Sequence, residues 1–324
     1  MYWEQQQRKR QLRKSGALIG GVCWGQEVLS LLLSLPVAWI AGWVQTLAWR
    51  WGGWPAAETA TQLRDLLFYA VVMLLPFVIL AQMQKHTLAE DIGRGKPPAS
   101  AYAMMVCLGF GLSTLSSYAA MGIEWCFNQI GLTIQSAADP FPTSLPALVI
   151  YYLSVAVLPP LAEEYCYRGV LYRQARRVMN PGPAMLLVAV IFAGMHMDLA
   201  TVPLALFFGL LAAYTREKYD SVKPAMVGHF VVNTVYFVVH VCASALPEGQ
   251  FAAVSLLYEA ATLVLAAAGV LLLFRSGGWN MDGLWRSVMT REQEGSSAPV
   301  WTAAPLLALF VIFLFGLVGS VSAL

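Results

Sequence analysis

The chain has 324 residues, of which 58% are hydrophobic and only 12% are charged. A soluble domain carries about 25% charged residues, so this composition excludes an ordinary soluble protein. The net charge is +2, and no run of Lys and Arg interleaved with aromatic residues occurs, so nucleic-acid binding has no support. The five cysteines form no C-x-x-C pair and most lie in apolar runs, which favours packing roles over a disulfide framework or a thiolate zinc site.

Long apolar runs dominate the chain, and a membrane-spanning helix needs about 20 apolar residues. The predicted spans are residues 28–49, 66–83, 101–122, 146–165, 183–199, 202–214, 224–244, 252–274 and 302–323. The run at 202–214 is short for a full crossing, so eight and nine spans both fit. We therefore predict an all-α fold, a polytopic transmembrane helix bundle.

The basic N-terminal segment MYWEQQQRKRQLRKSGALIGG precedes an apolar run that is too long for a signal peptide and lacks an A-x-A cleavage site. We predict a tail followed by an uncleaved helix. Lys and Arg gather in alternate loops, whereas residues 123–145 and 245–251 have none. Under the positive-inside rule this predicts nine spans, a cytoplasmic N-terminus and an outer C-terminus. Composition and loops suggest a bacterial cell membrane, with membrane lipid as the surrounding partner.

The chain divides into three segments by its ionisable residues. Residues 1–145 contain the tail and three helices without deep charge, and residues 246–324 contain two plain helices joined by a polar, cytoplasmic connector at 275–300. Residues 146–245 hold every intramembrane ionisable group of interest. Because such groups are costly in a membrane and are usually functional, we predict that residues 146–245 form the catalytic helical core.

The first motif, EEYCYR, runs from Glu163 to Arg168. On a helix, Glu164 and Arg168 are one turn apart and can pair, while Glu163 points about 100° away. One carboxylate is then held by the arginine while the other stays free to act as a general base. The alternative is a solvated helix end at the membrane surface.

The helix that carries this motif is predicted to extend over 146–178, about 50 Å, until the stop signal NPG that begins at Asn180. Pro159 and Pro160 lie one turn before the glutamates. They are expected to bend or loosen the helix and to leave backbone carbonyls unpaired.

The second motif places Phe192 and His196 four residues apart, and hence on one helix face. Gly194 between them allows a neighbouring helix to approach closely. The alternative roles for His196 are a hydrogen bond within the bundle or a position at the outer interface beside Asp198.

The third motif places His229 and Asn233 on one helix face, where the two side chains can donate hydrogen bonds to a single oxyanion. The alternative is polar contact between helices, a common use of both residues in membranes. His240, further along the helix, is predicted to be interfacial, and His86 to be an ordinary loop residue.

These three motifs, in this order, resemble the E-E-x-x-x-R, F-x-x-x-H and H-x-x-x-N motifs of the CPBP intramembrane proteases. That family joins type II CAAX prenyl endopeptidases with bacteriocin-processing and putative immunity proteins. The stretches PPLAEEYCYRGVLY and FFGLLAAYTREKYDSVKPAMVGHFVVN are also similar to the family's first and third motifs. The resemblance covers residues 145–245, roughly a third of the chain.

The resemblance implies an intramembrane endopeptidase that hydrolyses a peptide bond of a membrane-associated peptide or protein. Glu163 would activate a water molecule with assistance from His196. His229 and Asn233 would stabilise the oxyanion of the tetrahedral intermediate. A base, an orienting histidine and two donors are what amide hydrolysis needs.

The resemblance also implies that Glu164 and Arg168 form a supporting pair, although spacing alone leaves open which glutamate is the base. No metal is required by these residues. A divalent metal such as zinc remains an alternative, because Glu163, His196 and His229 could supply three ligands and leave a fourth position for water.

Two other functions compete with the protease. A non-catalytic immunity or scaffold protein could share the fold, and a transporter could use the same intramembrane ionisable groups, although no inverted repeat occurs. The protease interpretation requires Glu163, His196, His229 and Asn233 to converge. A depth count places His229 near the inner surface and His196 further into its helix, which is in tension with that requirement.

Overall fold

The computed structural model describes residues 2–134, 141–276 and 297–323. Five helices in these ranges are long and apolar enough to cross a membrane, which confirms an all-α membrane bundle. They are Tyr2–Met83, Ala99–Asn128, Leu145–Arg176, Lys223–Ala245 and Glu248–Arg275. Shorter apolar helices cover Pro181–Gly194 and Ala304–Gly319. The exact number of crossings, eight or nine, stays a prediction.

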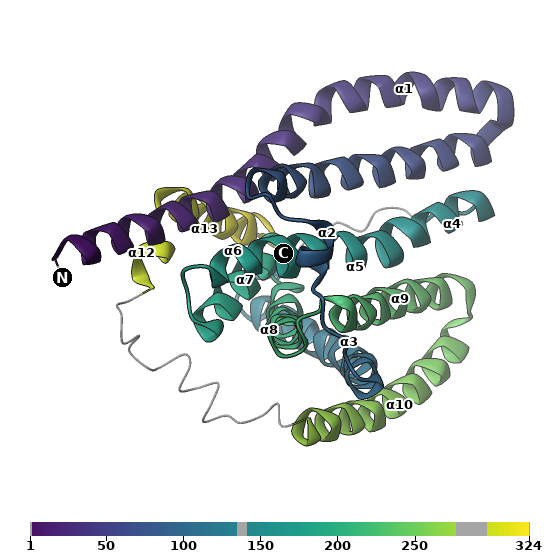
Figure 1. Ribbon diagram of the computed structural model, residues 1–324. Helices are drawn as coiled ribbons and strands as arrows, with labels where there is room; N and C mark the ends of the chain where they lie inside the picture. Colours follow the sequence, from purple (N-terminus) through teal and green to yellow (C-terminus); the bar gives the residue numbers. More distant parts are fainter. Residues whose placement is uncertain (1, 135–140, 277–296, 324) are drawn as a thin grey trace.

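The first helix, α1 (Tyr2–Met83), is a hairpin of two rods, as Figure 1 shows. The chain breaks its helical geometry at Gly53, whose φ of 67° lies in the region that glycine adopts without steric cost. Pro55 follows at the start of the second rod, where proline is well tolerated. The N-terminal segment predicted as a tail is helical from Tyr2, because Gln, Arg, Lys and Leu are good helix formers and neither Gly nor Pro precedes Gly16.

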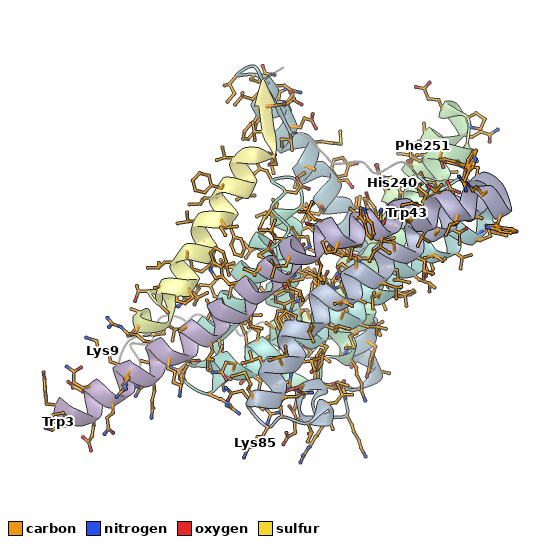
Figure 2. The ribbon with its side chains drawn as sticks, turned by 90° about the horizontal axis from the view of Figure 1, so that it is seen from above. Trp3, Lys9, Trp43, Lys85, His240 and Phe251 are labelled. Atoms are coloured by element: carbon orange, nitrogen blue, oxygen red, sulfur yellow. The ribbon has the colours of Figure 1, made fainter. Side chains whose placement is uncertain are left out.

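Labelled residues lie at two ends of the bundle. Figure 2 shows Trp43, His240 and Phe251 together at one end, away from Lys9, Lys85 and Trp3. The exposed Trp43 belongs to a tryptophan-rich stretch near the hairpin turn. Tryptophan is enriched where a membrane meets water, so the hairpin turn has the composition of a membrane interface.

One long helix, Leu145–Arg176, carries the first motif and matches the single helix expected over 146–178. It alternates α and π turns: α4 (Leu145–Tyr152), η1 (Leu153–Val157), α5 (Leu158–Glu163), η2 (Glu164–Leu171) and α6 (Tyr172–Arg176). Two prolines lie within α5, where they cannot donate backbone hydrogen bonds. Short π segments occur often at functional sites, and here η2 begins at Glu164, directly after Glu163.

The remaining elements surround this long helix. They are α2 (Leu88–Ile92), α3 (Ala99–Asn128), β1 (Leu132–Ile134), α7 (Pro181–Gly194), α8 (Val202–Tyr219), α9 (Lys223–Ala245), α10 (Glu248–Arg275), α12 (Ala298–Trp301), α13 (Ala304–Gly319) and β2 (Val321–Ala323). The strands β1 and β2 pair antiparallel and are too short to leave an alternating pattern in the sequence. The predicted connector at 275–300 falls mostly on 277–296, outside the described residues.

Helix α7 lies in the core of the bundle, packed along α8 (Figure 1). It is apolar on all sides, as expected of a fully enclosed helix. Near its end, Gly194 leaves room for the ring of Phe313 from α13, so the close approach predicted at this glycine is present.

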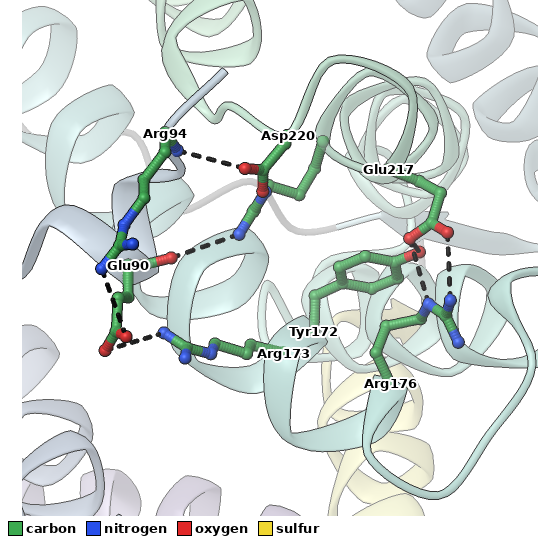
Figure 3. Close-up of a pocket in the computed structure, with 8 residues that line it drawn as sticks. Glu90, Arg94, Tyr172, Arg173, Arg176, Glu217 and Asp220 are labelled. Carbon is green, nitrogen blue, oxygen red and sulfur yellow. Dashed lines mark hydrogen bonds and ion pairs between the residues drawn. The ribbon is translucent and has the colours of Figure 1, made fainter. Parts of the chain in front are cut away.

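Charged side chains line a cavity of about 440 Å³ at one end of the bundle, the charged end (Figure 3). Its lining residues are Glu90, Arg94, Tyr172, Arg173, Arg176, Arg216, Glu217 and Asp220. Arg176 and Tyr172 both bond Glu217, at 3.0 and 2.8 Å, which joins α6 to α8. Arginines that follow α2, lie at the end of the long helix and lie at the end of α8 therefore meet in space.

His86 also belongs to the charged end and is not an ordinary loop residue. Its side chain is 2% exposed, with Nδ1 2.9 Å from Asp91 Oδ1 and Nε2 2.7 Å from a guanidinium nitrogen of Arg177. A nitrogen that faces a guanidinium accepts, and one that faces a carboxylate donates, so this geometry favours the neutral Nδ1–H imidazole. The contacts tie the segment after α1 to the long helix.

Acid is expected to weaken this contact. Burial lowers the pKa of His86 below its ordinary value of 6.5; Asp91 opposes the shift, while Arg173 and Arg177 add to it. Neutral His86 therefore stabilises the folded state above pH 6.5, and this stabilisation is lost as the pH falls through the folded-state pKa of His86. The melting temperature in detergent should fall between about pH 7.5 and about pH 5.5, and less so in His86→Asn, which can donate to Asp91 without titrating. Equal slopes in wild type, His86→Asn and the exposed control His240→Asn would contradict this assignment.

The contact at Gly194 predicts a second stability effect. In Gly194→Ala the added Cβ collides with the ring of Phe313, so the free energy of unfolding should fall by about 1–3 kcal/mol. Thermal unfolding in detergent measures the change. Gly122→Ala, whose added Cβ meets nothing, is the matched control and should be neutral or slightly stabilising. Recovery in Gly194→Ala/Phe313→Ala identifies the ring as the cause, and no recovery argues against it.

Candidate active site

A buried ion pair forms the centre of the candidate site. Glu164 and Arg168, one turn apart in η2, are both fully buried, with Arg168 Nη1 3.0 Å from Glu164 Oε1. His229 of α9 places Nδ1 3.0 Å from the same oxygen. The pairing expected from one-turn spacing is present, and His229 joins it from 65 residues away.

This arrangement fixes the ring of His229. A carboxylate oxygen that already accepts from Arg168 can only accept from Nδ1–H, so Glu164 holds the imidazole in a defined orientation. The opposite nitrogen, Nε2, then lies 3.8 Å from Glu163 Oε2. That separation is too long for a direct hydrogen bond and suits a bridging group.

Arg168 lies between aromatic rings. Its guanidinium carbon is 4.1 Å from the ring centre of Phe192 and 5.9 Å from that of Phe208. Gly209 on α8 makes space for it, because an added Cβ would lie 3.3 Å from Arg168 Nη2. The two aromatic faces and the single carboxylate compensate part of the cost of burying this charge.

Glu163 differs from its neighbour in exposure and in partners. Its side chain is 12% exposed, and Oε1 accepts a 2.5 Å hydrogen bond from the hydroxyl of Tyr69 on α1. Oε2 has no hydrogen-bond partner among the described residues. One oxygen is therefore held and the other is left available beside His229.

Phe192 of the second motif joins the two histidines. Its ring centre lies 5.2 Å from that of Tyr167, 5.0 Å from His196 and 5.9 Å from His229, each edge to face. The predicted shared face of Phe192 and His196 is present. Residue counts placed His196 and His229 at different depths in the membrane. In the structure, the ring of Phe192 contacts both histidines.

His196 itself lies just beyond α7 rather than inside a helix, which corrects the predicted span of 183–199. The chain turns there: Met197 adopts φ 50°, and the Asp198 side chain accepts hydrogen bonds from Ala200 and Thr201, which precede α8. His196 is exposed, and within the described ranges its polar contact is with the carbonyl of Phe192, 2.8 Å from Nδ1. Nδ1 donates to that carbonyl, so Nε2 is left as an acceptor.

Asn233 bonds the backbone of the long helix. Its Nδ2 donates to the carbonyl of Val155 at 2.9 Å. That carbonyl loses both its α-helical and its π-helical donor, since the residues four and five positions later are Pro159 and Pro160. The predicted unpaired carbonyl is thus present and is satisfied by the third motif, which keeps its second amide N–H.

The predicted site residues therefore fall into two groups. Glu163, Glu164, Arg168 and His229 are gathered around the ion pair, whereas Asn233 is bonded to the helix backbone and His196 is connected through a ring. Among the described residues, no three or more His, Cys, Asp or Glu side chains are close enough to hold a metal ion.

Comparison with known proteins identifies the central part of the chain. Residues 145–235 match the family model of the type II CAAX prenyl endopeptidase Rce1-like proteins. This segment belongs to the CAAX-protease-like family. No curated protein and no solved structure matches the chain. The family predicted from the three motifs is confirmed for this segment, and the described helices are those of a membrane protein.

The CAAX-protease-like segment contacts two aromatic residues that the motifs did not indicate. Phe208 lies 5.0 Å from the His229 ring and belongs to the matched segment, where it looks like any apolar residue of α8. Tyr69 belongs to α1, outside the matched segment. A tyrosine in an apolar span carries no spacing signal, so only the folded structure links it to Glu163.

The buried ion pair of the CAAX-protease-like segment predicts a large stability effect. Arg168→Met leaves Glu164 buried with one fewer partner, so the free energy of unfolding should fall by about 3–5 kcal/mol. Chemical unfolding in detergent measures it. Arg64→Met, which removes an exposed arginine next to Asp65, is the control and should change little. Partial recovery in Glu164→Gln/Arg168→Met is expected; a double variant worse than Arg168→Met refutes the uncompensated-charge explanation.

Proposed function

We propose that this protein is an intramembrane endopeptidase in which Glu163 is the general base. The observation that carries the proposal is the asymmetry of the two adjacent carboxylates. Glu164 is fully buried: its Oε1 accepts from Arg168 and His229, and its Oε2, enclosed in the core, has no hydrogen-bond partner among the described residues. Glu163 is partly exposed and keeps an unpaired oxygen next to His229 Nε2. Between the two, Glu163 is the glutamate able to take a proton from water.

The proposed reaction is amide hydrolysis. Oε2 of Glu163 takes a proton from water as the water oxygen bonds to the peptide carbonyl carbon. His229 Nε2–H and the second N–H of Asn233 donate to the oxyanion. The protonated Glu163 returns the proton to the leaving nitrogen as the C–N bond breaks. His229 donates from both ring nitrogens, and a carboxylate lies beside each of them. His196 orients the water through Nε2.

We propose that this reaction needs no obligatory metal. The alternative ligands Glu163, His196 and His229 have the donor chemistry of a catalytic zinc site. However, the described residues include no group of three such side chains close enough to share an ion. Nδ1 of His229 bonds Glu164 and Nδ1 of His196 bonds a carbonyl, an arrangement that leaves each Nε2 for water or a metal. The proposal of water activation by the carboxylate is supported by the unpaired Oε2 of Glu163.

We propose that the charged end faces the cytoplasm of a bacterial cell, which makes the N-terminus cytoplasmic. The support is the excess of Arg and Lys at this end and the tryptophans near the hairpin turn at the other. The substrate is then a peptide or protein associated with the membrane. The name of the matched family makes a peptide with a prenylated C-terminal cysteine the first probe to test.

The proposal predicts loss of cleavage in two variants. With protein in liposomes and a quenched fluorescent peptide carrying a farnesylated C-terminal CAAX sequence, Glu163→Gln and His229→Ala should each reduce kcat about 10²–10⁴-fold. His240→Ala, on the same helix but exposed and bonded only within it, is the matched control and should retain activity. Mass spectrometry identifies the cleaved bond. A chelator should leave the rate unchanged, and inhibition reversed by zinc overturns the metal-free mechanism.

Two results speak against the proposal. Undiminished cleavage by correctly folded Glu163→Gln removes Glu163 as the base. Binding of the prenylated and the unprenylated peptide without cleavage of either by the wild type favours a non-catalytic scaffold or immunity protein.

A further inference from the structure

Tyr69 contacts the proposed base from outside the family segment. Its hydroxyl lies 2.5 Å from Glu163 Oε1, and the two residues are 94 positions apart in the chain. A carboxylate only accepts, so the phenol is the donor. Among the described residues, Tyr69 is the hydrogen-bond partner of the Glu163 carboxylate, whose other oxygen, Oε2, has none.

The second rod of α1 packs against the long helix at three positions, one of which is Tyr69. Tyr69, Met73 and Phe77 are spaced by four and lie on one helix face. The carbonyl of Met73 accepts from Cys166 Sγ at 3.5 Å, and the ring of Phe77, fully buried, lies 5.5 Å from that of Tyr167. Three successive turns of α1 therefore contact α5 and η2. Tyr69, on the first of these turns, contacts the carboxylate of Glu163.

We propose that Tyr69 is a positioning residue for Glu163 and that α1 thereby completes the active site. The hydroxyl holds Oε1, which limits rotation of the carboxylate and directs Oε2 toward the space beside His229 Nε2, 3.8 Å away. Water placed there meets one defined acceptor oxygen. This inference rests on the proposed role of Glu163 as base.

The alternative is that Tyr69 only holds helices together. Met73 and Phe77 are buried against the long helix without any contribution from the hydroxyl, and the ring of Tyr69 packs against the core. Removal of the hydroxyl alone therefore separates the two roles. A positioning residue affects the rate of the chemical step, whereas a purely structural contact affects stability and leaves kcat per folded molecule unchanged.

The test compares Tyr69→Phe with Tyr167→Phe. Tyr167 is also buried beside the site, but its hydroxyl has no hydrogen-bond partner among the described residues, so it is a matched control for losing a buried hydroxyl. With the farnesylated peptide and protein in liposomes, Tyr69→Phe should lower kcat about 10- to 100-fold and leave KM within about twofold. Tyr167→Phe should match the wild type. In the Glu163→Gln background, Tyr69→Phe should cause no further loss of residual activity.

Infrared difference spectroscopy provides a readout that needs no turnover. The carboxylate stretch of Glu163, identified by its loss in Glu163→Gln, should shift in Tyr69→Phe and not in Tyr167→Phe. An unchanged kcat in Tyr69→Phe, while Glu163→Gln is inactive, overturns this inference and leaves the proposed function standing. Full activity of Glu163→Gln overturns the proposed function instead. A shifted band with unchanged kcat shows that the contact exists but does not position the base.

Discussion

The site depends on one constraint, a Glu164–Arg168 ion pair that is fully buried in the bundle. Such a pair is stable only when further groups satisfy it, and here His229 donates to the carboxylate while Phe192 and Phe208 face the guanidinium. Hydrophobic residues of similar volume often stabilise a core as well or better. The charge is therefore best explained by what it orients, namely the ring of His229.

The pair also separates the roles of two adjacent glutamates. A step of about 100° along the helix turns Glu164 into the core and Glu163 toward the less enclosed side, as the sequence indicates. The spacing of the motif does not distinguish Glu163 from Glu164 as the base. The difference arises from tertiary partners on α1 and α9, which no local pattern encodes.

The features that could be predicted are those that depend on residues close together in the sequence. Apolar runs specify helices, and most of each of the nine predicted segments is helical. The exceptions are the end of 183–199, where the chain turns before α8, and the ends of 302–323, which lie outside α13 and include strand β2. Polarity was a poor guide to helix ends, since the basic N-terminus is helical. The shared face of Phe192 and His196 follows from spacing, whereas the link between His196 and His229 through one ring depends on packing.

The prolines connect helix geometry to the third motif. Pro159 and Pro160 together leave the carbonyl of Val155 without a backbone donor, and an unpaired carbonyl in a membrane core costs several kcal/mol. Asn233 supplies the missing donor. Its amide has two N–H groups, so it can hold the helix with one and offer the other to an oxyanion. An aspartate at this position would bring acceptors to a carbonyl and could do neither, and a serine, with a single hydroxyl proton, could do only one. The side chain that repairs the helix is therefore also placed where the proposed reaction needs a donor.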